Sequence, residues 1–205
     1  MNQFERKSKT IYDKKADTYE QSFDGKFTRK FKRILLEAIH INNGDSILDV
    51  ACGNGRFLNM LSHKADIHGF GVDISENMIA CAQQMNPKMH FETAGCDKIP
   101  FENQSMDVVS VCAAFHHFPN IDAFAKEMHR ILKPGGRIYI AEVYLPAVIR
   151  RIYNPFLKFS KSGDVKFYSP EEITDCLSNA GFYREVVKTD GLVQIVAMQK
   201  KSKVR

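Results

Sequence analysis

The segment from Ile47 to Phe57 constrains the fold more than any other part of the chain. An apolar run there ends in an acid, Asp49, and continues through a turn that contains Gly53 and Gly55 into a helix-like apolar pattern. Glycines suit such a turn because a Cβ would oppose a positive φ and block the close approach of a ligand. A strand, a glycine turn and a helix bring backbone N–H groups and a helix N-terminus to one point. The segment therefore predicts a seat for an anionic ligand group at the end of a strand.

A second acid, Asp73, extends this interpretation. It ends the next apolar run and stands 20 residues after Gly53 (73 − 53), where an acid at a strand end typically binds a ribose diol. Ser75 is available to cap the following helix, so Asp73 is not needed for that role. Together the two segments predict a site for an adenosine-containing small molecule.

The glycine turn departs from the dinucleotide pattern Gly-x-Gly-x-x-Gly, because Leu58 stands where the third glycine would be. Asp49 also suits a pyrophosphate poorly, since like charges repel. An acid beside backbone N–H groups fits better with a ligand that ends in an amino acid, which carries both an ammonium and a carboxylate. A nicotinamide-dependent oxidoreductase is therefore the least supported of the enzyme classes considered.

At these residues the chain resembles the class I S-adenosylmethionine-dependent methyltransferases, especially the small-molecule branch that includes the ubiquinone/menaquinone-biosynthesis enzymes. The resemblance covers most of the chain, in order, through Asp49–Gly55, Asp73, Ala94–Phe101, Met106–Val109, Phe115–Phe118 and Arg130–Gly136. It implies an α/β fold with a Rossmann-like, seven-stranded, mostly parallel sheet, helices on both faces and an antiparallel last strand. It also implies S-adenosyl-L-methionine as cofactor and S-adenosyl-L-homocysteine as product.

The resemblance assigns cofactor binding to ten residues: Asp49, Ala51, Gly53, Asn54, Gly55, Asp73, Ile74, Cys96, Asp97 and Ala113. The first motif would hold the methionyl part and Asp73 the ribose. One position departs from the family, because its usual adenine-binding acid falls on Gly95. Either the loop shifts so that Asp97 reaches the adenine amino group, or that hydrogen bond is absent and the Cys96 N–H serves a ring nitrogen.

Further candidates surround the expected methyl-transfer site. His116 and His117 follow the fourth predicted strand, where a histidine can act as a general base or simply line the pocket. Tyr12 and Tyr19 lie in a segment that resembles the family's N-terminal cover of the cofactor, or they pack a helix on the sheet. Tyr144 and Tyr153 belong to a long aromatic and basic insert, either a substrate cover or a small separate core.

The pattern of elements indicates where these residues meet. Strands are expected at 47–50, 68–72, 90–93, 108–112 and 137–142, with a final hairpin near 183–188 and 192–199. One helix is expected at 121–132, where a Pro-Gly-Gly run would end it. Another is expected to begin at the capping box of Ser169. An N-terminal helix should carry Tyr12, Ala16 and Tyr19 on one face. The polar candidates then fall at carboxyl strand ends, which is the ligand-binding edge of an open α/β sheet.

Length and composition limit the remaining choices. A chain of 205 residues fits one domain, divided into a helical lid (1–43), a cofactor core (44–143), a substrate-cover insert (144–168) and a C-terminal helix and hairpin (169–205). No membrane span or signal sequence is expected, and five scattered cysteines favour reduced thiols in a cytoplasmic protein without a metal site. The net charge is 29 − 24 = +5, and the lysine and arginine residues gather in 26–33, 150–166 and 200–205. Solvated surfaces explain this basic character better than binding to nucleic acid does.

The predicted function is methyl transfer to a small-molecule acceptor by a monomer or homodimer. Two alternatives stay open: a methyltransferase that acts on RNA or protein, and a non-catalytic protein that binds S-adenosylmethionine.

Overall fold

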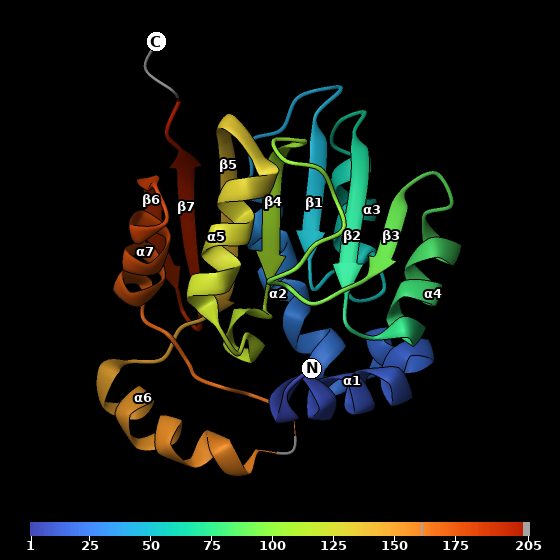
Figure 1. Cartoon of the computed structure of the whole chain (residues 1–205). Helices are drawn as coiled ribbons and strands as arrows, with labels where there is room; N and C mark the ends of the chain where they lie inside the picture. Colours follow the sequence, from blue (N-terminus) through green and yellow to red (C-terminus); the bar gives the residue numbers. More distant parts are fainter. Residues whose placement is uncertain (161, 203–205) are drawn as a thin grey trace.

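A twisted sheet of seven strands runs through the part of the chain that the structure describes, residues 1–160 and 162–202 of a computed structural model (Figure 1). The strands are β1 (Ser46–Val50), β2 (His68–Asp73), β3 (His90–Thr93), β4 (Met106–Cys112), β5 (Leu132–Val143), β6 (Phe182–Asp190) and β7 (Val193–Lys200). Their order is β3-β2-β1-β4-β5-β7-β6, and β7 runs antiparallel to both of its neighbours. The predicted fold is confirmed. Lys161 and residues 203–205, which belong to the basic segments, lie outside the described residues.

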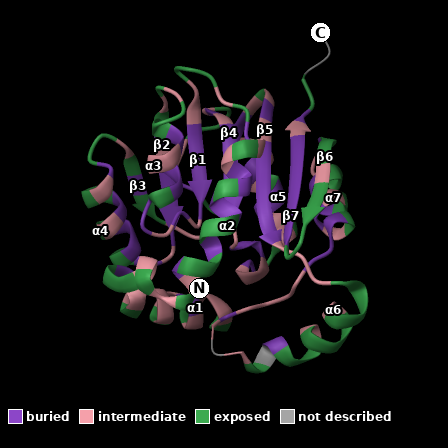
Figure 2. Ribbon diagram, turned by 180° about the vertical axis from the view of Figure 1, so that it is seen from behind, coloured by how far each residue is buried: buried purple, intermediate pink, exposed green. Residues whose placement is uncertain are grey.

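Helices cover both faces of the sheet, as the alternation of apolar residues along the strands requires. In β1, Leu48 and Val50 face one apolar cluster and Ile47 faces the other. The first cluster is completed by α5 (Ile121–Ile131) and α7 (Pro170–Asn179), the second by α2 (Phe23–Ala38) and α3 (Arg56–Ser62). Figure 2 shows the central strands buried along almost their whole length.

Two predicted boundaries are wrong. The helix expected at 121–132 ends at Ile131, and β5 begins at Leu132 instead of Arg137. Leu132 pairs with Met106, and the register then shifts before Arg137 pairs with Val108. The Pro-Gly-Gly run is therefore an irregularity inside a long strand, because pairing with β4 continues on both sides of it.

The N-terminal helix is also shorter than predicted. Helix α1 (Gln3–Lys15) ends before Ala16, and a 3₁₀ helix, η1 (Ala16–Gln21), follows it. Tyr12 and Tyr19 nevertheless approach each other, with ring centroids 6.1 Å apart. The capping box predicted at Ser169 and the β6–β7 hairpin are both present.

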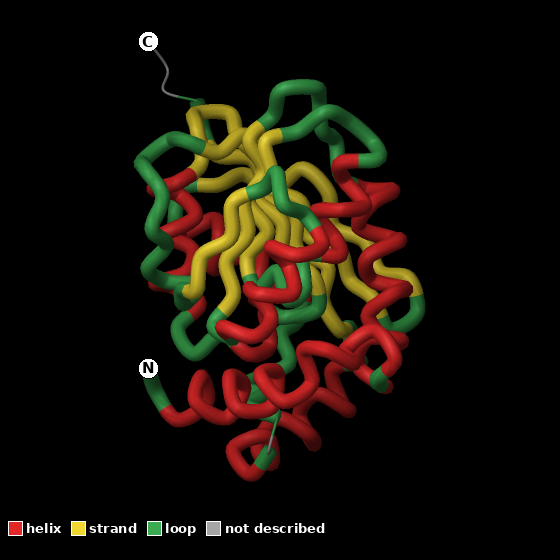
Figure 3. Tube along the Cα trace, turned by 90° about the vertical axis from the view of Figure 1, so that its right-hand side faces the viewer, coloured by secondary structure: helices red, strands yellow, loops and turns green. Residues whose placement is uncertain are grey.

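The carboxyl ends of the parallel strands lie at one edge of the sheet, and two segments lie across it (Figures 1 and 3). One is the N-terminal region with α1. The other follows β5 and contains α6 (Ala147–Tyr153) and the 3₁₀ helix η3 (Asn154–Phe159). Among the described residues, no helix combines the length and apolar character that a membrane crossing needs.

Candidate functional site

The turn between β1 and α3 needs its two glycines for different reasons. Gly53 has φ +52°, and a Cβ added there would meet no atom within 4 Å, so the backbone borders open space. Gly55 has φ +75°, and a Cβ added there would lie 2.7 Å from Nδ2 of Asn86, the residue that follows α4 (Glu76–Met85). The first glycine leaves room for a ligand, and the second lets the turn pack against the rest of the fold.

Two alanines beside this turn adopt backbone conformations that are uncommon for residues with a Cβ. Ala51 has φ +57° just after β1, and Ala113 has φ +53° just after β4. Such left-handed residues cost free energy and are concentrated at functional sites. Both alanines line the same cavity, which identifies the strand ends as the place to look for a ligand.

This cavity has a volume of about 100 Å³ and lies at the carboxyl ends of the parallel strands. The predicted site residues that line it are Tyr12, Tyr19, Ala51, Gly53, Asp73, Ile74, Cys96, Ala113 and His117. They come from α1, η1 and the ends of four parallel strands (β1 to β4) or the segments just after them, so distant parts of the sequence meet at the predicted edge.

Two backbone hydrogen bonds fix the buried carboxylate of Asp73 on the cavity wall. Its Oδ2 accepts a hydrogen bond from the Gly53 N–H and its Oδ1 from the Ser75 N–H, both at 2.9 Å. Burial raises the pKa of Asp73, while these backbone donors oppose the rise. The bond to Gly53 joins the carboxylate to the glycine turn, so the two predicted ligand-binding elements form one unit.

Asp49 lies behind the cavity wall and does not line it. Its side chain is 2% exposed, and Ser110 Oγ donates a hydrogen bond to Oδ1 at 2.6 Å. Burial raises the pKa of Asp49 to about 7, with Ser110 and the charge of Lys32 opposing the rise and Asp73 adding to it. A cation bound nearby would favour the ionised form of this carboxyl.

The remaining predicted residues lie outside the cavity. The Asn54 amide donates to Glu20 Oε1 at 3.2 Å, which ties the glycine turn to η1. Asp97 borders a neighbouring hollow with Lys9. Tyr153 is 58% exposed on α6. Gly55, Tyr144 and His116 also do not reach the cavity wall.

Tyr12 and Tyr19 cover the cavity from the N-terminal side. Tyr12 Oη lies 3.3 Å from His117 Nε2, and burial raises the pKa of both phenols, that of Tyr19 to about 12. The cover is fastened to α4, because Ser75 Oγ donates to Asp13 Oδ1 at 2.6 Å and the Asn77 amide donates to the Asp13 carbonyl at 3.0 Å. Both tyrosines therefore line the cavity on a segment that is fixed to α4, and their role as lid residues stays a prediction.

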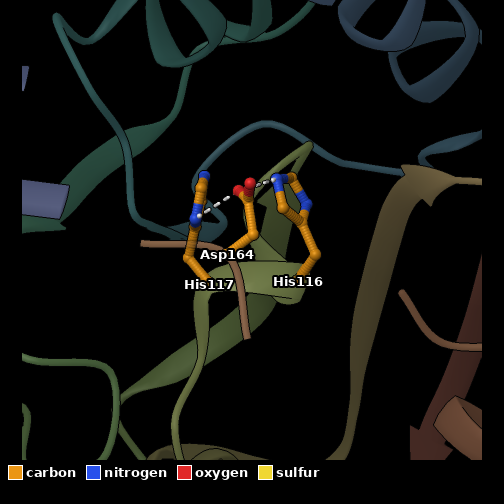
Figure 4. A group of neighbouring side chains, drawn as sticks. All are labelled: His116, His117 and Asp164. Carbon is orange, nitrogen blue, oxygen red and sulfur yellow. Dashed lines mark ion pairs between the residues drawn. The ribbon is translucent and has the colours of Figure 1, made fainter. Parts of the chain in front are cut away.

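His116 and His117 occupy a short 3₁₀ helix, η2 (Phe115–His117), after β4. His116 Nδ1 lies 2.8 Å from Glu142 Oε1, and although burial lowers the pKa of His116, the Glu142 charge outweighs it and the net shift is upward. Burial and the neighbouring His116 lower the pKa of His117. Asp164 lies between the two imidazoles (Figure 4).

Sequence reasoning missed two acids of this site, Glu5 and Asp164. Glu5 lines the cavity from α1, where its Oε2 also accepts the Asn2 N–H of a capping box at 2.6 Å. The Asn-x-x-Glu spacing could have indicated the helix start but not the cavity. Asp164 lies 47 residues after His117 (164 − 117) and carries no motif of its own.

Comparisons with known proteins agree with this geometry. Residues 48–140 match the family described as "Methyltransferase domain". A demethylmenaquinone methyltransferase of Chlorobaculum tepidum is 34% identical over 156 residues, which cover 66% of this chain and 64% of that protein. The chain thus aligns with slightly less than two thirds of the length of this relative.

Two solved structures share the fold. A chain from the complex between the Haloferax volcanii Trm112 methyltransferase activator and a methyltransferase has a TM-score of 0.84 at 19% identity, covering 97% of this chain and 99% of its own length. The [4+2]-cyclase SpnF has a TM-score of 0.72 at 16% identity, covering 88% of this chain and 83% of its own length.

The fold and the cavity define a Rossmann-like domain with its ligand site at the carboxyl edge of the sheet. Together with the matched domain and the relatives, they show that the chain resembles the class I S-adenosylmethionine-dependent methyltransferases, in particular those of the menaquinone-biosynthesis type.

Proposed function

We propose that this chain transfers the methyl group of S-adenosyl-L-methionine to a small-molecule acceptor. The observation that carries the proposal is the covered cavity at the ends of β1, β2 and β4, where the glycine turn, Asp73 and the lid tyrosines meet. When bound, the cofactor would supply a sulfonium methyl group that an acceptor nucleophile can attack in line. The chain's own residues would align the acceptor and exclude water.

The residues present fit the cofactor. Open space beside Gly53 leaves room for the methionyl end. A nearby ammonium would favour the ionised form of Asp49, which lies behind the cavity wall. Each oxygen of Asp73 accepts one backbone N–H and retains a lone pair for a ribose hydroxyl. These contacts support the methionyl and ribose assignments made from the sequence.

Glu5 supplies a candidate for the missing adenine contact. A Cβ on Gly95 would stand 3.3 Å from Asp97 Oδ1 and 3.8 Å from Glu5 Oε1. Glu5 lines the cavity and Asp97 lines the neighbouring hollow. We therefore assign the adenine amino group to the Glu5 carboxylate, which reaches from α1 to the place where the family carries its acid on the loop.

A small acceptor is favoured because two segments lie on or against the residues that line the cavity. The lid is one of them. The other is the stretch after η3, where Lys7 Nζ donates to the Ser160 carbonyl at 3.1 Å and the Val165 N–H donates to the His116 carbonyl at 2.8 Å. A polymer would require both segments to move. The apolar side chains of Met78 and Phe118 on the wall suit an aromatic or aliphatic acceptor, such as the quinone precursor in the relative's name.

Two alternatives are supported by specific features. An RNA or protein substrate would dock on α6 and η3, which expose basic and apolar side chains together. A non-catalytic binding protein is compatible with the same cavity, because the matched cyclase shows that this fold is not restricted to methyl transfer.

Calorimetric titration with S-adenosylmethionine, S-adenosylhomocysteine and NAD tests the cofactor class, with Asp73→Ala as the variant and Asp190→Ala, on the distant hairpin, as its control. Binding of the two sulfur ligands alone, weakened at least tenfold only in Asp73→Ala, supports the proposal. Binding of NAD or of no ligand refutes it.

Transfer of a labelled methyl group into a cell extract then tests the reaction. Label that remains in small molecules after ribonuclease and protease treatment supports the proposed acceptor class. Label lost with either enzyme indicates a polymer substrate, and binding without turnover indicates a non-catalytic protein.

A further inference from the structure

Three side chains from two distant segments converge next to the lid. His116 and His117 follow β4, whereas Asp164 belongs to the stretch between η3 and α7. One nitrogen from each imidazole and one carboxylate oxygen all lie within 4.8 Å of one another. The side chains are 12%, 12% and 17% exposed, respectively, and Figure 4 shows the carboxylate between the two rings.

A second, outer set of contacts orients each of these groups. Glu142 Oε1 lies 2.8 Å from His116 Nδ1, which leaves Nε2 directed at the cluster, 3.7 Å from Asp164 Oδ1. Asp164 Oδ2 accepts hydrogen bonds from the hydroxyls of Ser160, at 2.8 Å, and Ser162. Its Oδ1 is therefore the oxygen presented to both imidazoles.

His117 provides the observation that is hardest to explain without a ligand. Its Nε2 lies near the Tyr12 hydroxyl at 3.3 Å. Its Nδ1 is buried and makes no hydrogen bond, although Asp164 Oδ1 is only 3.2 Å away. A buried nitrogen without a hydrogen bond is costly, and the charged contact to Asp164 does not supply one. A cation between this nitrogen and the carboxylate would satisfy both.

We propose that His116 Nε2, His117 Nδ1 and Asp164 Oδ1 form a binding site for a divalent first-row transition metal, with Zn²⁺ as its representative. Two imidazoles and one carboxylate suit such metals, whereas Mg²⁺ and Ca²⁺ prefer oxygen ligands. Bond lengths of about 2.0–2.2 Å place neighbouring ligand atoms roughly 3.0–3.5 Å apart. The distances of 3.2 and 3.7 Å to Asp164 Oδ1 lie within or close to this range, and all three ligand atoms lie within 4.8 Å of one another, so binding would draw them together. The outer contacts match the second set of hydrogen bonds that orients metal ligands.

Three protein ligands leave at least one coordination position for water or for the acceptor. A role in methyl transfer rests on the proposed function, but metal binding does not. In that role, a hydroxyl bound to the metal would lose its proton to solvent more readily. The resulting oxygen anion would bond to the methyl carbon, and the electron pair of the carbon–sulfur bond would return to sulfur.

The test is a titration of chelator-treated protein with Co²⁺, followed by visible absorption and then by displacement with Zn²⁺. The variant is Asp164→Asn, which keeps the shape and the contacts to the serine hydroxyls. His117→Gln removes a second ligand, and His63→Gln on the exposed end of α3 is the matched control. Circular dichroism checks that each variant is folded.

The wild type and His63→Gln should bind one equivalent of Co²⁺. Asp164→Asn and His117→Gln should bind Co²⁺ at least tenfold more weakly. Ser160→Ala should weaken binding by a smaller factor. Equal affinity in all proteins, no bound Co²⁺, or the charge-transfer absorption of cobalt bound to cysteine would each overturn the proposal. Because the readout needs no cofactor, failure of metal binding is distinguishable from failure of the proposed methyl transfer.

Discussion

Replacing Asp49 by asparagine should remove a pH dependence of stability that is built into the core. The side chain is 2% exposed and its charge is offset by a hydrogen bond from Ser110 and by the distant charge of Lys32. Asparagine keeps an oxygen that can accept the Ser110 hydroxyl, but it cannot ionise. The substitution thus removes the charge while it preserves the shape.

The size of the effect follows from the shifted pKa of Asp49. Burial raises it from 3.8 in the unfolded chain to about 7 in the folded protein. Between these values the folded state holds one proton more than the unfolded state, so the free energy of unfolding falls as the pH rises and levels off above the folded pKa. At about 1.4 kcal/mol for each pKa unit, the loss between pH 5 and pH 8 is about 2–3 kcal/mol. The asparagine variant escapes this loss.

Urea unfolding of both proteins at pH 5, 6, 7 and 8 measures the effect, because every other titrating group is shared and its contribution cancels in the difference. The variant should gain about 2–3 kcal/mol relative to the wild type across this range. A difference that stays constant with pH would refute the conclusion that the buried carboxyl has a raised pKa.

Three further predictions concern single contacts. Asp73→Asn should destabilise the fold by about 1–3 kcal/mol, because its NH₂ group must face the N–H of Gly53 or Ser75; urea unfolding measures this, and unchanged stability contradicts it. Glu5→Ala should weaken S-adenosylmethionine binding about tenfold, and Gly95→Asp in the same protein should restore it by returning an acid to the loop; calorimetry without loss or without rescue rejects the adenine assignment. Ser169→Ala should cost about 0.5–2 kcal/mol through loss of the α7 cap, with Ser178→Ala, which leaves that cap intact, as the control in thermal unfolding.

The fold was largely predictable because its signals are local. The strands β1, β2 and β4 are short apolar runs with a turn or acid at the end, and Ser169 caps α7 as its spacing predicts. The junction at 131–137 was not predictable from local signals. A Pro-Gly-Gly run normally interrupts regular structure, but Leu132 pairs with Met106 before it, and that pairing depends on a strand 26 residues earlier (132 − 106).

The site divides in the same way. Ala51, Asp73 and Ala113 could be placed because the end of a parallel strand determines where they lie. Glu5 and Asp164 could not, since their positions depend on segments that pack across the edge of the sheet. The Asp13–Ser75 hydrogen bond holds α1 there, and the Val165–His116 hydrogen bond holds the stretch with Asp164.

The choice between methyl transfer and another activity depends on the side chains around His117, which the sequence alone described least. A cyclase and a methyltransferase share this fold with the chain, so the glycine turn and Asp73 indicate a cofactor but not what is done with it. Under the proposed function, the distinguishing groups are Tyr12, His117 and the cluster that His117 forms with His116 and Asp164. Cofactor affinity alone therefore cannot separate a methyltransferase from a binding protein. Turnover of a labelled methyl group, compared between wild type and Asp164→Asn with and without Zn²⁺, does separate them.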